Sequence, residues 1–531
     1  MLVNPPQTPQ SEIDTWLAAL GFSPGRHPFQ YTNADDERDL IPRSFVDVEG
    51  YEQIKGSKTI IVFAPKGGGK SALRLVLANQ AAPLSPEKEI LAVECTDFDL
   101  LLQKQHEAQP LTIIEYLYWL LRAGLKSLFD ALFPVQRSTF TEIAVTKDIQ
   151  SKRAESLLPP ARFRLARCLR QYHPTLLGAE TLYERFNWLD PAFKPDWEKF
   201  IDYFHRKELH ELLQTTPLHT NVSARLLASL NDYMIAADDS KVTPKEQMQE
   251  FVNLVQAAGF TAVHFLVDRL DETSTTASKP QMQADILEPL LAHLVLLETP
   301  GTAFKFFLSK EARDVLLERP TIRRDRLTDQ ALTITWSRER LKALLDARLN
   351  TYSDGEVQEL LQLCREIKVK DSNSQDFWLG EWIEMEMLQQ AQGSPRLLLK
   401  AGQFLFQAHL DQFGPRGLLE KEDWDVGKKA LVKNSPPLLK ISRHSSIVIV
   451  GNREVKLSSQ EHQFLLILAT ANGLCDRDIL AKKIWGSDIN DDPIYKIVNR
   501  IRNKLRDNAK DPSYLITERG KGFRLIHYEL I

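Results

Sequence analysis

Ala64-Pro65-Lys66-Gly67-Gly68-Gly69-Lys70-Ser71 decides how the first half of this 531-residue chain is interpreted. Residues 59–63 (TIIVF) precede it and are apolar and β-branched, as in a buried strand, and residues 72–78 (ALRLVLA) contain good helix formers and no breaker. A strand, a glycine-rich turn and a helix in this order direct backbone N–H groups and the helix N-terminus at a phosphate group. The sequence therefore predicts a phosphate-binding loop.

The individual positions of this loop predict how it holds a nucleotide. Lys70 is placed to reach the β- and γ-phosphates, and the Ser71 hydroxyl is placed to be a ligand of Mg²⁺. We therefore expect ATP or ADP with Mg²⁺ as cofactors. Ala64 stands where such loops usually begin with glycine, which we expect to be a tolerated variant; the alternative is a flexible glycine-rich turn. The residues expected to contact the nucleotide are Lys66, Gly67, Gly68, Gly69, Lys70, Ser71 and Ala72.

An acidic turn supplies the other half of the expected site. Residues 262–267 (AVHFLV) are mostly apolar and run into Asp268 where a strand should end. We expect Asp268 to hold the water shell of Mg²⁺, and Glu272 or alternatively Asp271 to polarise an attacking water molecule. Acidic turns after strands are common, so this turn indicates a nucleotide site only in combination with the glycine-rich loop upstream.

A second apolar run, residues 304–310 (FKFFLSK), predicts another strand of the same sheet. Ser309 at its end is expected beside the γ-phosphate, where it senses the nucleotide. A plain strand terminus is the alternative interpretation.

Together these segments resemble the STAND/AAA+ class of P-loop ATPases over about residues 28–420. The resemblance rests on the loop, on residues 268–272 (DRLDE), on residues 332–337 (LTITWS) leading into a helix, and on residues 393–397 (GSPRL). It implies a helical lid in which Pro395 and Arg396 contact the nucleotide and report its phosphate state. It also implies slow hydrolysis of ATP to ADP and phosphate, and oligomerisation on activation.

A different pattern begins toward the C-terminus. Residues 447–457 (IVIVGNREVKL) predict a small hairpin, and residues 458–461 (SSQE) begin a helix as a capping box. A second helix is expected near residues 477–485. A third is expected over residues 493–506, where apolar residues recur at helical spacing and every charged residue is basic. Residues 514–525 predict two strands joined by a tight turn, which together form a wing.

This C-terminal pattern resembles the winged-helix output domain of OmpR/PhoB-type bacterial response regulators. The matching residues are Leu457, Glu461, Asn472, Gly473, Arg477, Leu480, Trp485, Gly486, Val498, Ile501, Arg502, Lys504, Leu505, Thr517, Arg519, Gly520, Gly522, Phe523 and Arg524. The resemblance implies that the third helix enters the major groove of double-stranded DNA and that the wing lies on the adjacent backbone or minor groove. The expected base-reading residues are Lys496, Asn499 and Arg500, and the expected phosphate contacts are Arg502, Lys504, Arg506, Arg519 and Lys521.

The length of the chain requires several domains, because 531 residues exceed what one core holds. The expected fold class is multidomain α/β: a P-loop NTPase core with a parallel sheet, a large helical insertion and a helical lid, followed by an α+β winged helix. The expected boundaries are a leader over 1–28, the core over 29–330 with its insertion at about 100–250, the lid over 331–425, a linker over 426–445 and the winged helix over 446–531.

Charge indicates the kind of partner that the protein binds, and cysteine usage indicates its cellular compartment. The net charge is −4, yet residues 441–531 hold 15 Lys or Arg and 11 Asp or Glu, and a basic tail on an acidic body favours a nucleic-acid partner. The four cysteines are far apart, which excludes a disulfide scaffold and fits a reducing cytoplasm. With no signal-peptide pattern and no long apolar stretch, we expect a bacterial-type cytoplasmic protein without a membrane partner.

These patterns predict a nucleotide-switched DNA-binding protein, acting as a transcriptional regulator or as a stress or antiphage defence sensor. Its expected partners are double-stranded DNA, further copies of the chain and a protein trigger or effector. One alternative is a DNA-stimulated ATPase that loads a recombination or motor assembly. The other is a signalling scaffold whose winged helix binds protein. ATP hydrolysis with and without DNA separates the first two, and salt-dependent DNA binding tests the third.

Overall fold

The computed structural model describes most of the chain, in two compact units. Residues 33–336 form the first unit, and residues 1–32 together with residues 337–531 form the second. None of the helices that it describes is long and apolar enough to cross a membrane. The described residues are 10–80, 90–106, 111–132, 161, 165, 168, 172, 243–277, 279–323, 329–371, 374–435, 437–451, 453–471, 474–486, 491–507, 509, 512–518 and 521–531.

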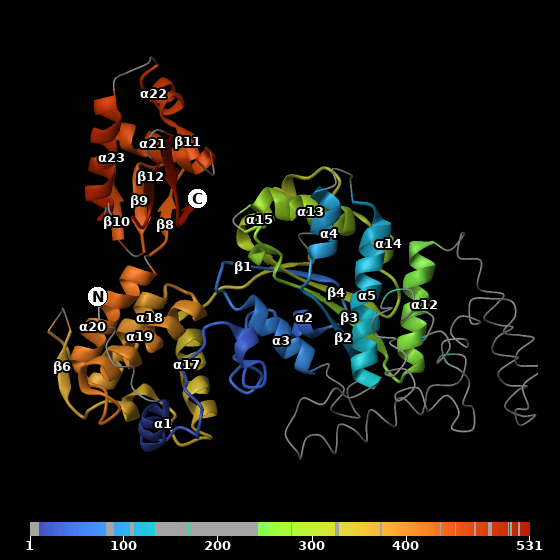
Figure 1. Cartoon of the computed structure of the whole chain (residues 1–531), viewed down its shortest axis with the longest axis horizontal. Helices are drawn as coiled ribbons and strands as arrows, with labels where there is room; N and C mark the ends of the chain where they lie inside the picture. Colours follow the sequence, from blue (N-terminus) through green and yellow to red (C-terminus); the bar gives the residue numbers. More distant parts are fainter. Residues whose placement is uncertain are drawn as a thin grey trace, which may run out of the picture. The chain divides into compact units, whose positions relative to one another are not determined.

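A five-stranded parallel sheet is the centre of the first unit (Figure 1). The strands are β1 (Ile60–Ala64), β2 (Ile90–Cys95), β3 (Ala262–Val267), β4 (Thr302–Ser309) and β5 (Ala331–Thr333), in the order β2-β3-β4-β1-β5. The strands are apolar along most of their length, as is usual where helices cover both faces of a parallel sheet. The predicted α/β class with a parallel sheet is confirmed.

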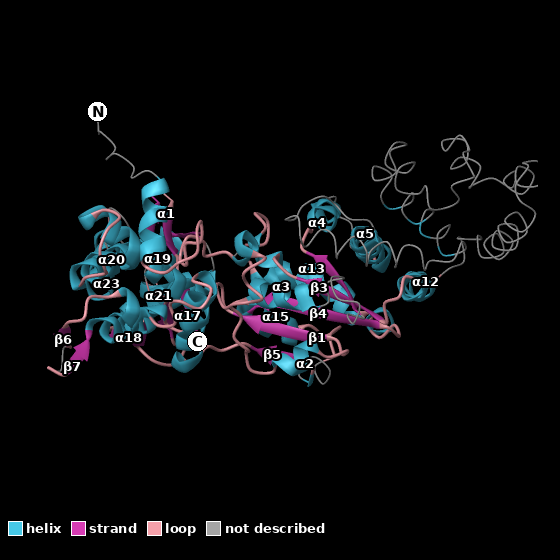
Figure 2. Ribbon diagram, turned by 90° about the horizontal axis from the view of Figure 1, so that it is seen from below, coloured by secondary structure: helices cyan, strands magenta, loops and turns pink. Residues whose placement is uncertain are grey.

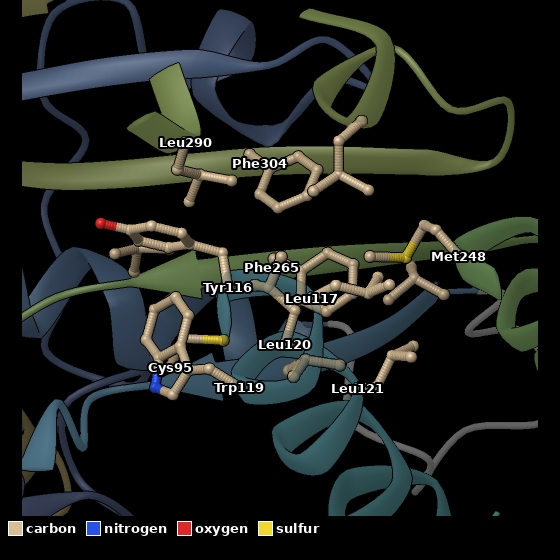
Figure 3. Close-up of a cluster of buried hydrophobic side chains, with 14 of the residues drawn as sticks. Cys95, Tyr116, Leu117, Trp119, Leu120, Leu121, Met248, Phe265, Leu290 and Phe304 are labelled. Atoms are coloured by element: carbon tan, nitrogen blue, oxygen red, sulfur yellow. The ribbon is translucent and has the colours of Figure 1, made fainter. Parts of the chain in front are cut away.

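Alternate strand residues face two separate cores. Val62 and Leu266 are buried on the face covered by α2 (Tyr51–Lys55) and α3 (Lys70–Gln80). On the other face Phe265 and Phe304 stack with their ring centroids 4.8 Å apart (Figure 3). Figure 2 shows β3, β4, β1 and β5 side by side in this order, and Figure 1 shows α13 and α15 on one side of the sheet and α3 on the other. The helices that contribute to the second core are α4 (Asp99–His106), α5 (Ile113–Leu132), α12 (Pro244–Ala257), α13 (Pro280–Ala292), α14 (Leu294–Leu297) and α15 (Lys310–Glu318).

The predicted helical insertion supplies part of that second core. In α5 the Tyr116 hydroxyl donates to the carbonyl of Ile286, and Trp119 Nε1 donates to the carbonyl of Asp97 at 2.6 Å (Figure 3). These aromatic side chains are therefore core residues with satisfied polar atoms. Most of the insertion between residues 133 and 242 lies outside the described residues.

Helices dominate the first half of the second unit. They are α1 (Gln10–Ala19), α17 (Arg338–Tyr352), α18 (Leu379–Ala391), α19 (Pro395–Phe413) and α20 (Lys421–Asn434), with a small hairpin of β6 (Lys368–Lys370) and β7 (Asp376–Trp378). The lid was expected to begin at residue 331. The unit boundary instead falls between Trp336 and Ser337, because β5 pairs with β1 and belongs to the sheet.

The expected N-terminal leader is not a separate segment from residue 10 onward. Trp16 of α1 is buried, and its Nε1 donates to the carbonyl of Gly417 at 2.9 Å. Arg348 of α17 is also buried, and its guanidinium donates to the carbonyl of Pro28. Through apolar burial and these long-range hydrogen bonds, residues 10–32 pack with α17–α20. We call residues 10–32 together with residues 337–435 the helical segment.

The expected linker over residues 426–445 is also corrected by the structure. Helix α20 continues to Asn434, because Trp424 and Leu431 are fully or almost fully buried on its inner face. Gly427 allows close packing, since a Cβ there would lie 2.8 Å from the carbonyl oxygen of Phe404. Lys429 and Lys433 lie on the solvent-facing side of this packed helix.

The C-terminal domain contains two sheets and three helices around one core. The first sheet has the order β10-β9-β8-β14, with β8 (Leu439–Ile441), β9 (Ile447–Val450), β10 (Arg453–Lys456) and β14 (Tyr528–Leu530). The second has the order β11-β13-β12, with β11 (Leu474–Asp476), β12 (Leu515–Glu518) and β13 (Gly522–Leu525). The helices are α21 (Ser459–Ala471), α22 (Arg477–Trp485) and α23 (Asp491–Leu505). The predicted hairpin, three helices and wing are confirmed, and β8 and β14 are additions that the sequence analysis missed.

A buried ion pair joins the helices of the second unit. His409 Nδ1 lies 2.7 Å from Asp423 Oδ2, and His409 Nε2 lies 2.9 Å from the carbonyl oxygen of Arg416, to which it must donate. The Trp16 ring stacks on this imidazole, with centroids 4.9 Å apart. Burial alone would lower the pKa of His409, but the hydrogen bonds to Asp423 and to the Arg416 carbonyl, with the charges of Asp423 and Glu420, raise it above its usual value.

This pair predicts a pH dependence of stability. A raised pKa in the folded state means that the stabilisation is fully present below the unfolded-state pKa of about 6.5 and is lost as the pH rises through the folded-state value. The reference is the double variant His409→Phe/Asp423→Asn, in which neither position titrates. The melting temperature of the wild type should fall relative to this reference as the pH rises above about 6.5, where about 1 kcal/mol corresponds to about 2–4 °C.

The exposed His444 provides the control for this measurement. The variant His444→Phe should follow the wild type across the same pH range. A wild-type advantage that grows with rising pH would contradict a protonated His409.

Candidate nucleotide and nucleic-acid sites

The glycine-rich loop has the backbone that its sequence predicts. Gly67 and Gly69 adopt φ values of 76° and 90°, in the left-handed region that favours glycine. A Cβ on Gly68 would lie 2.9 Å from the carbonyl oxygen of Pro65. The loop follows β1 directly and leads into α3 at Lys70, so it lies at the carboxyl end of a parallel strand, where open α/β sheets bind ligands.

Lys70 is buried inside this loop and has two partners. Its Nζ donates to the carbonyl of Ala64 at 3.3 Å and to Asp271 Oδ2 at 2.9 Å. Asp271 follows β3, so the contact joins the loop to the acidic turn. A carboxylate thus occupies the anion-facing end of Lys70, which is the position that a phosphate oxygen would take.

The Ser71 side chain hydrogen-bonds with Asp268, and their role as holders of Mg²⁺ stays a prediction. Burial raises the pKa of Asp268, while Arg74 and a hydrogen bond with the Ser71 side chain oppose that shift. Asp268 Oδ2 accepts from Arg74 Nε at 3.0 Å. Asp268 Oδ1 is buried and has no hydrogen-bond partner among the described residues.

These two side chains fit a Mg²⁺ ion. A hydroxyl oxygen and a carboxylate oxygen are hard ligands of the kind that Mg²⁺ prefers. Mg²⁺ is usually held by one or two protein oxygens together with phosphate oxygens and water, so a larger carboxylate cage is not required. The unpartnered Oδ1 of Asp268 is the atom that such a site would use.

The sequence analysis missed Arg74, which organises the site. Its side chain is 1% exposed and is paired with Asp268, with Asp35 at 2.6 Å and with Glu94 of β2. A buried guanidinium needs such partners because an unpaired internal charge is costly. The available signal was spacing, since Arg74 follows Ser71 by three residues and therefore lies on the same face of α3.

The other predicted nucleotide residues have different surroundings. Ser309 pairs in register with Ala64, so it lies beside the start of the loop, and its hydroxyl contacts Gln283 Oε1 at 2.7 Å. Glu272 is exposed and accepts from Arg269 Nε at 2.8 Å. Lys66 is exposed and Ala72 lies in the first turn of α3. Pro395 and Arg396 begin α19 in the second unit, and their contact with a nucleotide stays a prediction.

Helix α23 presents one exposed polar face in the C-terminal domain. Its apolar residues are buried in the core, among them Ile494, Val498 and Ile501. The opposite face exposes Lys496, Asn499 and Arg500, which the sequence analysis assigned to base reading. It also exposes Tyr495 and Asn503, which the sequence analysis missed although helical spacing places them on the same stripe.

The five residues predicted to contact phosphate differ in their exposure. Arg506 and Lys521 are exposed, whereas Arg519 lies outside the described residues. Arg502 is 8% exposed, and it donates to the carbonyl of Leu515 at 2.7 Å and to Thr517 Oγ1 at 3.0 Å. The structure therefore gives Arg502 an internal role in place of the predicted phosphate contact.

Lys504 is only partly available to a nucleic acid. Its Nζ donates to Glu461 Oε2 at 2.7 Å. Burial alone would raise the pKa of Glu461, but this bond and the hydrogen bonds from Ser458 hold it below its usual value. The pair joins α23 to the capped start of α21, so Lys504 contributes to the fold as well as to the surface charge.

Comparisons with known proteins agree with this geometry. Residues 452–525 match the family model described as "Transcriptional regulatory protein, C terminal". The C-terminal domain is an OmpR/PhoB-type winged-helix DNA-binding domain. The chain is 37% identical over 90 residues to the alkaline phosphatase synthesis transcriptional regulatory protein SphR of Synechococcus elongatus, covering 16% of this chain and 35% of that protein. It is 35% identical over 88 residues to the transcriptional regulatory protein RstA of Escherichia coli, covering 16% and 37%.

A solved structure is also similar to part of the chain. It is the Klebsiella pneumoniae RstA DNA-binding domain in complex with the RstA box, with 35% identity, 15% of this chain and 81% of that chain covered, and a TM-score of 0.15. The chain spans about a third of the length of the curated relatives. These similarities therefore concern the winged helix.

The Lys70–Asp271 contact predicts that Asp271 competes with an anion for the loop. In the variant Asp271→Asn, Lys70 keeps a hydrogen-bonding neighbour, but the negative charge that competes with the phosphate is removed. Mg·ADP should therefore bind about three- to tenfold more tightly, as measured by isothermal titration calorimetry. Lys70→Ala, which removes the cation itself, should abolish binding. Weaker binding by Asp271→Asn would show instead that this carboxylate acts together with the ligand.

The burial of Arg502 predicts a stability effect that its neighbour on the helix should not share. Arg502→Met leaves the Leu515 carbonyl and Thr517 without their donor, which should cost about 1–3 kcal/mol in unfolding of the C-terminal domain. Arg500→Ala changes an exposed side chain and should stay within about 0.5 kcal/mol. Equal melting temperatures for the two variants would contradict the internal role of Arg502.

Proposed function

We propose that this protein is a DNA-binding regulator whose winged helix is controlled by Mg·ATP and Mg·ADP at the glycine-rich loop. The observation that carries the DNA-binding half is the exposed stripe on α23, where Lys496, Asn499 and Arg500 stand together above a buried apolar face. Arginine and lysine donate to guanine, and asparagine pairs with adenine, in the major groove. Arg506 and Lys521 extend this surface with charges suited to phosphate.

The nucleotide half rests on three residues from distant parts of the sequence. Lys70 and Ser71 begin α3, and Asp268 follows β3, yet the Ser71 side chain lies against Asp268 and Lys70 contacts Asp271 of the same turn. This is the residue set that cradles the phosphates of a nucleoside triphosphate and its metal ion. When Mg²⁺ is bound, it offsets the negative charge of the β- and γ-phosphate oxygens.

The residues of the acidic turn then have separate tasks. Lys70 exchanges its bond with Asp271 for phosphate oxygens, and Asp268 keeps one oxygen on Arg74 while the other is available to the metal ion. Glu272 is exposed and paired with Arg269, so it needs a change of partner before it can polarise water. We therefore propose slow turnover of ATP and a protein that spends most of its time in nucleotide-bound states.

Assembly of several copies is part of this proposal. A single winged helix with a few basic contacts binds DNA weakly and with strong dependence on salt. Joining several such domains raises the overall affinity without new contacts. The nucleotide would thus regulate DNA binding by controlling how many winged helices act together. Regulation of transcription and defence against foreign DNA both fit this mechanism.

DNA binding is tested by fluorescence anisotropy with sites selected from random double-stranded DNA. The double variant Lys496→Ala/Arg500→Ala should lose about 1–3 kcal/mol per base contact and bind selected and unselected DNA almost equally. Lys429→Ala/Lys433→Ala, which also removes two positive charges but from exposed residues of α20, is the matched control and should bind as the wild type does. Wild-type protein that is folded but shows no salt-dependent DNA binding would support the protein-binding scaffold instead.

Nucleotide control is tested by ATP hydrolysis with and without double-stranded DNA, beside Lys70→Ala and Glu272→Gln. We expect Mg·ATP to bind and to turn over slowly, with little effect of DNA on the rate. Both variants should lose the residual turnover, and Glu272→Gln should retain binding. Strong stimulation by DNA would favour the motor-loading alternative, and absence of nucleotide binding would refute this half of the proposal.

A further inference from the structure

Trp336 contacts the glycine-rich loop, and the next residue of the chain, Ser337, is the N-cap of α17. After β5 the backbone continues beside the end of β1, and Ile334 N donates to the carbonyl of Phe63 at 2.8 Å. Phe63 is followed immediately by the loop. The next residues after β5 are therefore carried to the loop by the register of the sheet.

The indole of Trp336 packs on the glycines of the loop. Its Nε1 donates to the carbonyl oxygen of Gly68 at 3.0 Å. A Cβ added to Gly69 would lie 3.4 Å from Cζ2 of the same ring, so the ring contacts the loop backbone closely. The bond is long-range in sequence, and it fixes one carbonyl of a loop whose glycines otherwise allow wide freedom.

This carbonyl matters because of the geometry of a peptide unit. The C=O of Gly68 and the N–H of Gly69 belong to the same planar trans peptide and point in opposite directions. A donor that holds the carbonyl on one side therefore directs the Gly69 N–H to the other. Backbone N–H groups of such loops are the donors that bind phosphate oxygens.

The residue after Trp336 is Ser337, which directly precedes α17. Ser337 is the N-cap of α17, and its side chain accepts from Arg340 N at 3.3 Å. The boundary between the two compact units also falls between Trp336 and Ser337. Rotation of the Gly68–Gly69 peptide would therefore move Trp336, the last residue of the first unit. Trp336 directly precedes Ser337, the N-cap of α17 in the second unit.

We propose that Trp336 is a positioning residue that aims the Gly69 N–H at a bound phosphate and couples occupancy of the loop to the start of α17. The proposal rests on the proposed function, because it requires a phosphate-bearing ligand at the loop. Loss of the Nε1 donor leaves the peptide free to rotate in both the empty and the occupied loop. The effect of the ligand on α17 then disappears while the loop itself persists.

The test compares the full-length wild type with Trp336→Phe, which keeps an aromatic ring but has no donor. Hydrogen exchange of the first turn of α17 is measured with and without saturating Mg·ADP, and calorimetry gives the affinity. Binding of Mg·ADP should slow this exchange in the wild type. In Trp336→Phe the difference should be lost, and the affinity should fall about three- to tenfold, which equals about 0.7–1.4 kcal/mol.

Two controls separate positioning from folding. Trp378→Phe changes an exposed tryptophan of β7 and should leave both measurements as in the wild type. If Trp336→Phe does not fold, benzothienylalanine incorporated at position 336 replaces the N–H by sulfur at nearly unchanged ring size. It should likewise lose the ligand effect on α17.

The outcomes distinguish this inference from the function on which it rests. If the wild type binds no Mg·ADP, the proposed nucleotide site fails, and the coupling fails with it. If the wild type binds Mg·ADP but α17 exchange does not respond, or responds equally in the donor-free variant, the nucleotide site stands and the role of Trp336 is overturned.

Discussion

The ion pairs of the buried Arg74 guanidinium hold together the carboxyl end of the sheet in the first unit. Its partners come from three places: Asp35 precedes β1, Glu94 lies in β2 and Asp268 ends β3. An internal arginine without carboxylates would cost several kcal/mol, so all three segments must arrive together for the sheet to close properly. Their arrival also places Asp268 against Ser71. Packing and the candidate metal site are thus consequences of one electrostatic constraint.

The same end of the sheet contains groups that satisfy one another's hydrogen bonds. Lys70 has Asp271, the Gly68 carbonyl has Trp336, and Glu272 has Arg269. Each of these bonds can be exchanged for a bond to a phosphate, a water molecule or a rotated peptide at low net cost, since hydrogen bonds lost and formed nearly balance. Asp268 Oδ1, in contrast, is buried and has no hydrogen-bond partner among the described residues. A loop built in this way can respond to a ligand without unfolding its surroundings.

The C-terminal domain separates folding from recognition on a single helix. One side of α23 fills the core, and Arg502 and Lys504 are directed to carbonyl and carboxylate oxygens of the domain. The other side leaves Tyr495, Lys496, Asn499, Arg500 and Asn503 in solvent. Basic residues of one helix therefore have unequal roles, and their contribution to DNA affinity follows exposure and not their number. The proposed switch needs only this exposed stripe to be brought to DNA in several copies.

The sequence by itself determined the local elements, because strand, turn and helix signals are short-range. It predicted the glycine-rich turn after β1, the acidic turn after β3 and the winged-helix pattern, while the metal site assigned to Ser71 and Asp268 stays a prediction. Contacts between residues far apart in the chain were decided by tertiary structure alone. The partners of Arg74, Trp336 and Arg502 carry no local signal, α20 was mistaken for a linker, and β14 joins β8 from the far end of the domain. Local propensity reports what a segment can form, whereas burial and long-range pairing depend on segments that the local sequence does not specify.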